Sequence, residues 1–132
     1  MAQIVASYVK PGGFFYIAEF HPFAMVFDDE ADSLKFRYPY FEKPARRYDV
    51  RGSYADESAN VNVKDEFGWD HPLSEIVTSL IDNGLRIEFL HEFPYSVFKQ
   101  LPFLVPGDQG TWVFPEGEQP IPLMFSLKAC KD

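Results

Sequence analysis

The sequence lacks the features that define several large classes of protein. A single cysteine, Cys130, allows no disulfide within the chain, and we expect a reducing, cytoplasmic location. No apolar run approaches the roughly 20 residues that span a bilayer, and no basic stretch precedes a long apolar run, so we expect neither a membrane span nor a secretory signal. The 12 basic residues are outnumbered by 20 acidic ones, and the net charge of −8 argues against nucleic acid or an anionic membrane as partner.

Metal-binding and phosphate-binding patterns are also missing. Three histidines, at 21, 71 and 91, match no zinc spacing, and we expect no metal. The acidic run DDEADS at 28–33 lacks the glycine and the closing glutamate of a calcium loop, so it is interpreted as a solvated turn. No G-x-G-x-x-G or similar loop occurs, and the paired glycines Gly12-Gly13 come before a predicted strand, where they form a turn.

Apolar and aromatic residues are abundant. Hydrophobic residues make up 46% of the 132 residues and aromatic residues 17%, with 14 Phe. This composition can build a hydrophobic core, and the length fits one domain spanning residues 1–132. The 11 prolines and the many rings indicate long ordered loops rather than a helical bundle.

The beginning of the chain predicts a short helix followed by a strand. Pro11-Gly12-Gly13 ends the helix, and the apolar run 14–20 is typical of a strand buried on both faces. His21-Pro22 ends that strand, because proline cannot continue a ladder. The helix is expected to present one apolar side made of Ile4, Val5, Tyr8 and Val9.

The middle of the chain predicts a small antiparallel meander. Residues 34–41, 46–55 and 61–67 alternate in part between apolar and polar side chains, as strands with one wet face do. Pro39 places the first of these runs at an edge.

A second helix is predicted over 72–83. Asp70 or His71 is the expected cap, Glu75 suits the first turn, and Gly84 suits the left-handed position after the helix. A strand at 85–93 follows, with Leu85, Ile87, Phe89 and His91 expected on one face. A long loop over 94–120 leads to a final strand at 121–131, which completes an α/β pattern.

Three segments carry a family resemblance that covers nearly the whole chain. Residues 10–23, 71–103 and 122–129 resemble the C-terminal half of class I S-adenosylmethionine-dependent methyltransferases, most closely bacterial members that act on small molecules. The helix–KPGG–strand pattern is widespread in that family. The motifs EFHPF (19–23), GSYAD (52–56) and EFLHEFP (88–94), in this order, are more specific.

The resemblance implies a partial Rossmann-like methyltransferase sheet. In that family the strand order is 3-2-1-4-5-7-6, with strand 7 antiparallel. The runs 14–20, 85–93 and 122–130 then correspond to strands 5, 6 and 7, and the helix at 72–83 joins strands 5 and 6. Residues 21–70 become a cap insertion that contains the meander, and 94–121 a covering loop.

The resemblance also implies S-adenosylmethionine as the cofactor and a small molecule as the methyl acceptor. The family holds the cofactor in its first half, through a glycine-rich turn and an acidic residue. This chain has neither, so we expect no cofactor on this chain alone and no activity without a missing N-terminal half.

The family topology places candidate site residues where strands 5 and 6 end. Glu19 and His21 are candidates for a base, because a methyl acceptor that must lose a proton needs one. Phe23, Trp69 and His71 are candidates for the substrate wall. A structural role is favoured for the most prominent of these: His21 as a strand-end hydrogen-bonding residue, His71 as a helix cap and Trp69 as core beneath the meander.

Three functions remain open at this point. The chain is the substrate cap of a methyltransferase, or a module that binds a small ligand or a protein, or an interaction protein. Strand 5 without strands 1–4 has an unpaired apolar edge, which is a template for association. We therefore expect either a homodimer through that edge or pairing with the missing half.

Overall fold

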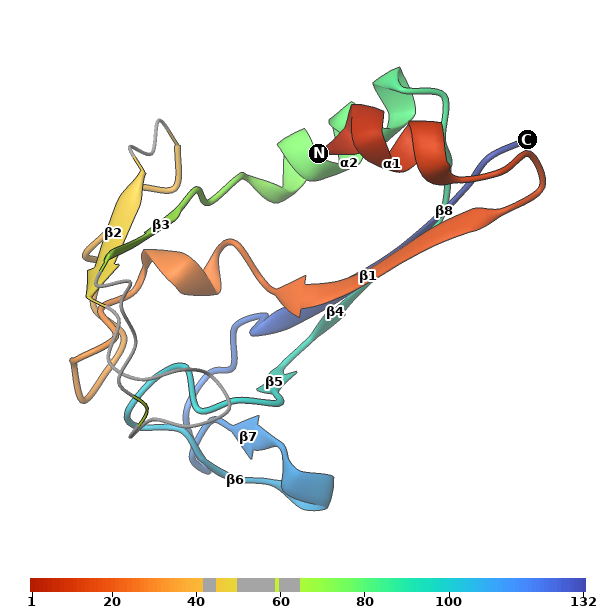
Figure 1. The fold of residues 1–132 in the computed structure, drawn as a ribbon. Helices are drawn as coiled ribbons and strands as arrows, with labels where there is room; N and C mark the ends of the chain where they lie inside the picture. The colour runs from red at the N-terminus through yellow and green to blue at the C-terminus, as the bar shows by residue number, and fades with distance from the viewer. Residues whose placement is uncertain (42–44, 50–58, 60–64) are drawn as a thin grey trace.

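The computed structural model describes residues 1–41, 45–49, 59 and 65–132. Two helices lie along the same side of a three-stranded sheet, with a hairpin and a smaller three-stranded sheet beyond one end of it (Figure 1). Within the described residues, no helix is both long and apolar enough to cross a membrane. The elements in chain order are α1 (Ala2–Tyr8), β1 (Phe14–Phe20), the 3-10 helix η1 (Ala24–Val26), β2 (Arg46–Asp49), β3 (Asp65–Gly68), α2 (Leu73–Asp82), β4 (Arg86–Phe93), β5 (Tyr95–Ser96), β6 (Val105–Pro106), the 3-10 helix η2 (Asp108–Gly110), β7 (Trp112–Val113) and β8 (Met124–Cys130).

The main sheet has the order β1-β8-β4, and β8 is antiparallel to both neighbours. β1 and β4 are therefore parallel to each other, with the last strand between them. The mixed α/β architecture is confirmed, and so are strands close to 14–20, 85–93 and 121–131. The order and direction agree with what the resemblance implies for strands 5, 7 and 6.

The prediction that 14–20 is buried on both faces is wrong. Phe14 is 62% exposed and Tyr16 is 52% exposed, because β1 is an edge strand and both helices cover the opposite face. The buried strand is the central one, β8. The core under the helices consists of Ala2, Leu80, Leu85, Phe125, Leu127 and Ala129.

The predicted face of the strand at 85–93 is also wrong, because β4 contains a bulge at Glu88. Ile87 pairs with Ala129, but the next paired residue is Phe89, opposite Lys128. Ile87 therefore packs with the helices, whereas Phe89 turns to the open face and meets Tyr16 there at 6.2 Å between ring centroids. The bulge thus adds an aromatic side chain to the open face of the sheet.

The bulge is held by an ion pair between Glu88 and Lys128. Their side-chain hydrogen bond lowers the pKa of Glu88 from its ordinary 4.5 and raises the pKa of Lys128 above its ordinary 10.5. Glu88 contributes to folding stability above pH 4.5, and this contribution is lost as the pH falls through its lowered pKa. Lys128 contributes to folding stability below pH 10.5, and this contribution is lost as the pH rises through its raised pKa.

Replacing Glu88 by glutamine is expected to reduce stability slightly near neutral pH, because it removes this ion pair. In acid both proteins carry a neutral side chain at this position, so their unfolding curves should converge. Urea denaturation of both proteins across the pH range measures this. A difference that is independent of pH would contradict a role for the ion pair.

The predicted apolar side of the first helix is wrong in part. Ala2 is buried and Val5 packs beside it, but Ile4 is 64% exposed and Tyr8 is 83% exposed. Both exposed side chains line an apolar groove of about 530 Å³ that also includes Phe14 at the start of β1. The helix therefore has a second apolar surface that no described residue covers.

The second helix agrees with its prediction except at its start. Glu75 lies in the first turn, and Gly84 adopts the left-handed conformation with φ of 78°. Neither Asp70 nor His71 is the N-cap; Pro72 holds that position, and the backbone N–H of Leu73 donates to the hydroxyl oxygen of Tyr40 at 3.2 Å. Tyr40, from the segment 21–70, thus satisfies one backbone donor at the start of the helix.

Replacing Gly84 by alanine is expected to cost about 1–2 kcal/mol, because an L side chain is strained at this φ although the space around it is open. Asparagine tolerates this conformation better, so Gly84→Asn should cost less than Gly84→Ala. Urea denaturation of the two variants measures the difference. Equal costs would show that the backbone relaxes at this turn.

The predicted meander is confirmed only in its last two runs. β2 and β3 form an antiparallel pair, with the Nε of Arg47 donating to the Oδ1 of Asp65 at 2.6 Å. Residues 34–41 form no strand and contribute only an isolated bridge between Phe36 and Phe27, so that part of the prediction is wrong. The motif GSYAD at 52–56 and the remaining parts of the runs 46–55 and 61–67 lie outside the described residues.

Residues 94–121 are not a structureless loop. They carry the small sheet β5-β7-β6, and the final strand begins at Met124 rather than at 121. Together with η1 they build a second core. Its buried members are Ala24, Val26, Phe27, Leu101, Leu104, Phe114 and Leu123.

Candidate functional site

The carboxyl ends of β1 and β4 meet at the start of β8. The backbone N–H of His21, which follows β1, donates to the carbonyl of Leu123 at 2.9 Å. The N–H of Leu123 in turn donates to the carbonyl of Phe93 at 2.8 Å. Three strand ends are therefore tied into one junction, and the side chains beside it form the candidate site.

The imidazole of His21 is buried in this junction, with 4% of the residue exposed. Its Nδ1 accepts the backbone N–H of Phe23 at 3.1 Å, so the ring proton of the neutral form is on Nε2. Nε2 lies 2.8 Å from Oε1 of Glu92 and donates to it. The sequence did not single out Glu92, although it lies in the EFLHEFP motif.

This geometry restricts what His21 can do. Nδ1 carries the lone pair, and it is already engaged by the backbone. Accepting a proton there would break the bond to Phe23. The arrangement suits a strand-end hydrogen-bonding residue, and as a base His21 would need the turn at Phe23 to move. Glu19 is exposed, and its Oε1 accepts the N–H of the adjacent Phe20 at 2.9 Å.

A pocket of about 180 Å³ adjoins the junction. Phe20 at the end of β1 and Phe98 form its aromatic sides, with ring centroids 6.3 Å apart. Gln100 also lines it, and its Nε2 donates to the Leu123 carbonyl at 3.1 Å, the carbonyl that the His21 N–H also contacts. Oε1 of Gln100 is buried and has no hydrogen-bond partner among the described residues. We refer to this cavity as the ring pocket.

The acidic turn predicted as solvated is organised by Arg37, and Asp29 from this turn lines the ring pocket. Nη1 of Arg37 donates to Asp28 at 2.9 Å and to Glu30 at 3.0 Å. The backbone N–H of Glu30 and then the guanidinium of Arg37 lower the pKa of Asp28. Within residues 1–41, 45–49, 59 and 65–132, no three His, Cys, Asp or Glu side chains gather as a metal site would require.

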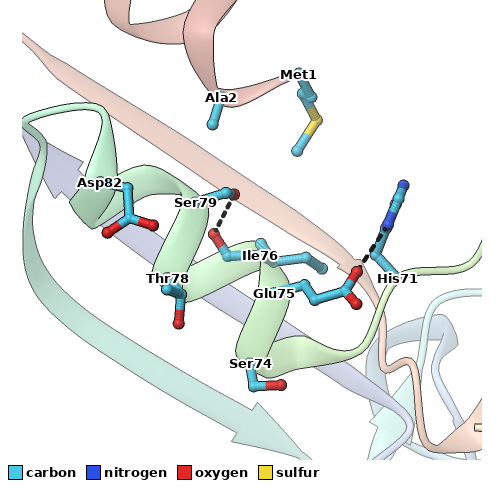
Figure 2. A pocket seen from close by; sticks show the side chains of 9 residues that line it. All are labelled: Met1, Ala2, His71, Ser74, Glu75, Ile76, Thr78, Ser79 and Asp82. Carbon is cyan, nitrogen blue, oxygen red and sulfur yellow. Dashed lines mark hydrogen bonds and ion pairs between the residues drawn. The ribbon is translucent and has the colours of Figure 1, made fainter. Parts of the chain in front are cut away.

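None of the predicted substrate residues Phe23, Trp69 and His71 lines the ring pocket. Phe23 packs in the second core, 5.5 Å from the ring of Phe27. Trp69 is 64% exposed, so its alternative as core beneath the meander is wrong. His71 lines a different groove, of about 540 Å³ between Met1 and α2, where its Nδ1 lies 3.1 Å from Oε2 of Glu75 (Figure 2). The structure thus keeps Glu19 and His21 at the strand ends and separates Trp69 and His71 from the pocket there.

The paired glycines do not fit a cofactor loop. The N–H of Gly12 donates to the carbonyl of Lys131 and the N–H of Gly13 to that of Lys10, both at 2.8 Å. Both donors that could hold an anionic group are therefore used by the chain itself. A Cβ on Gly13 would lie 2.9 Å from the Lys10 carbonyl oxygen, so glycine is required for this close turn. The residues present do not fit S-adenosylmethionine at this turn.

Comparison with solved structures shows a likeness of fold. The fold matches a crystal structure from Listeria monocytogenes, described as a "putative S-adenosylmethionine dependent methyltransferase", with a TM-score of 0.59 and 16% sequence identity. The likeness covers 99% of this chain and 53% of that chain, so this chain spans about half its length. No family model matches the sequence, and no curated protein is similar to it. The fold of this chain is therefore similar to about half of that structure.

Proposed function

We propose that this chain is the substrate-cap half of an S-adenosylmethionine-dependent methyltransferase, with a Rossmann-like sheet completed by a cofactor-binding half outside these 132 residues. The observation that carries this is the unequal coverage: nearly all of this chain matches, but only 53% of the neighbour. The methyl acceptor is a small molecule held where β1 and β4 end. On this proposal the chain alone is inactive.

The uncovered edge of β1 supports this proposal. Within the described residues β1 pairs with β8 alone, which leaves its other edge open. Beside it lies the groove lined by Ile4, Tyr8 and Phe14, all at least 62% exposed. Exposed apolar side chains next to an unpaired strand mark a surface that another sheet or helix covers. A further strand added at this edge would extend the sheet in the order that the resemblance implies.

A cofactor titration tests the proposal. We expect no saturable heat when S-adenosylmethionine is titrated into this chain alone, because the glycine turn has no free donors. The same titration into the chain combined with the polypeptide encoded directly ahead of it should show saturable binding. Saturable micromolar binding by this chain alone, or an upstream segment without a glycine-rich loop, would contradict the proposal.

The second candidate is a homodimer, which the same open edge favours. Two copies pairing β1 against β1 would satisfy the open backbone edge and place the side chains of β1, Tyr16 among them, beside those of the partner strand. Sedimentation velocity across a concentration series should then show a dimer that Tyr16→Lys disrupts. Ile81→Lys, at a 53% exposed position on α2, is the matched control and should leave the dimer intact. A monomer at all concentrations would rule out this candidate and leave the edge for the cofactor half.

A further inference from the structure

We propose that the ring pocket binds one uncharged aromatic or heteroaromatic ring that carries an O–H or N–H donor. On the proposed function, such a ring is the class of methyl acceptor. Only this identification rests on the proposed function. The binding of the ring is argued from residues of this chain that the structure describes. The proposal stands on the size of the pocket, on its walls, on one unpaired oxygen and on the charge at its mouth.

The size of the pocket selects a single ring. Its volume is about 180 Å³. An apolar protein cavity of about 150 Å³ holds benzene, so the ring pocket accommodates one ring with one or two small substituents. A larger molecule would have to extend past Phe98, which is 58% exposed at the opening.

The walls favour a flat apolar ligand. The rings of Phe20 and Phe98 are inclined by 44° to each other across one side of the pocket. Phe27 and Leu101 are 5% and 2% exposed and form its buried part. Aromatic rings pack favourably against one another in offset and edge-on arrangements, which a planar ligand can adopt here.

The amide of Gln100 supplies the polar contact. Its Nε2 is committed to the Leu123 carbonyl, which fixes the orientation of the amide. Its Oε1 is buried and accepts no hydrogen bond within the described part of the chain. A buried oxygen without a donor is unfavourable. Water does not reach Oε1 in this conformation, so a ligand hydroxyl or N–H makes this hydrogen bond when small movements of the pocket side chains open a path to it.

The charge at the mouth excludes an anion. Asp29 lines the pocket, and its Oδ1 accepts the hydroxyl of Tyr38 at 3.1 Å. Asp28, Asp29 and Glu30 all lie within ion-pair distance of the guanidinium of Arg37, so this arginine is already neutralised. A carboxylate or phosphate on the ligand would meet these acids with no compensating cation among the described residues that line the pocket, whereas a neutral phenol or indole would not.

Binding to the isolated chain tests this directly, with phenol, toluene and benzoate as probes and backbone amide resonances as the readout. We expect saturable shifts at Met25, Gln100 and Leu101 with phenol and with toluene, and none with benzoate. Gln100→Met retains the bulk of the side chain but removes the oxygen. It should reduce the preference for phenol over toluene by about 3–10-fold, the usual worth of one hydrogen bond.

Two further variants keep the outcome decisive. Phe98→Ala, at a 58% exposed position where truncation should cost little stability, should weaken the binding of both phenol and toluene. His71→Ala, in the groove beside Met1, should change neither. Absent shifts, shifts confined to that groove, saturable benzoate binding, or an unchanged phenol preference in Gln100→Met would overturn the proposal. Because no cofactor is present, this result is independent of the cofactor titration that tests the proposed function.

Discussion

Replacing Phe125 by alanine is expected to lower the free energy of unfolding by about 3–5 kcal/mol. Phe125 is fully buried near the start of β8, in one core with Leu80 and Leu127. Its ring also meets the edge of the His21 ring, 6.1 Å between centroids. Truncation would therefore leave a cavity between the helices and the strand junction. Because small domains are stable by only about 5–15 kcal/mol, this loss is a large fraction of the total.

Urea denaturation followed by circular dichroism measures this loss, with Phe14→Ala as the matched control. Phe14 is also a phenylalanine of the main sheet, but it lies on the open face and is 62% exposed. Its replacement should cost less than about 1 kcal/mol. Similar losses for the two variants would mean that Phe14 is covered in solution.

The two helices and the strands of the main sheet could be predicted from the sequence, but the faces of those strands could not. Apolar runs and Pro-Gly stops locate strands and helices because they reflect local chemistry. The burial of a run depends on what covers it, and the apolar run 14–20 resembles a central strand although β1 is an edge. The helical spacing of Ile4 and Tyr8 does describe an apolar surface. On the proposed function, the partner of that surface lies outside this chain.

The site was predictable only in its location. The EFHPF and EFLHEFP motifs contain His21 and Glu92, but nothing in the sequence pairs two residues that are 71 positions apart. The bulge at Glu88 could not be predicted from the sequence either, because a register shift depends on the partner strand. Gln100 lies in a segment that the sequence marked only as a loop, and its importance comes from the unpaired oxygen.

The role of His21 can be decided by two variants, and we expect it to be structural. His21→Ala should cost about 2–4 kcal/mol, because it opens a cavity beside Phe125 and leaves the N–H of Phe23 without its acceptor. His21→Asn places an amide oxygen near the position of Nδ1, so it should recover a substantial part of that loss. Glu92→Gln should cost less than about 1 kcal/mol, because the Glu92 side chain is 53% exposed and glutamine still offers an oxygen to Nε2.

Methyl transfer by the complete enzyme then separates structure from catalysis. If His21 only organises the turn, His21→Asn should retain most of kcat once the protein is folded, and the loss in His21→Ala should follow its stability. A base at this position predicts the opposite: His21→Asn would be folded and stable yet would lose turnover by about 100-fold or more, the usual contribution of general base catalysis. The hydrogen bond from Phe23 to Nδ1 favours the first outcome, because it occupies the lone pair that a base would use.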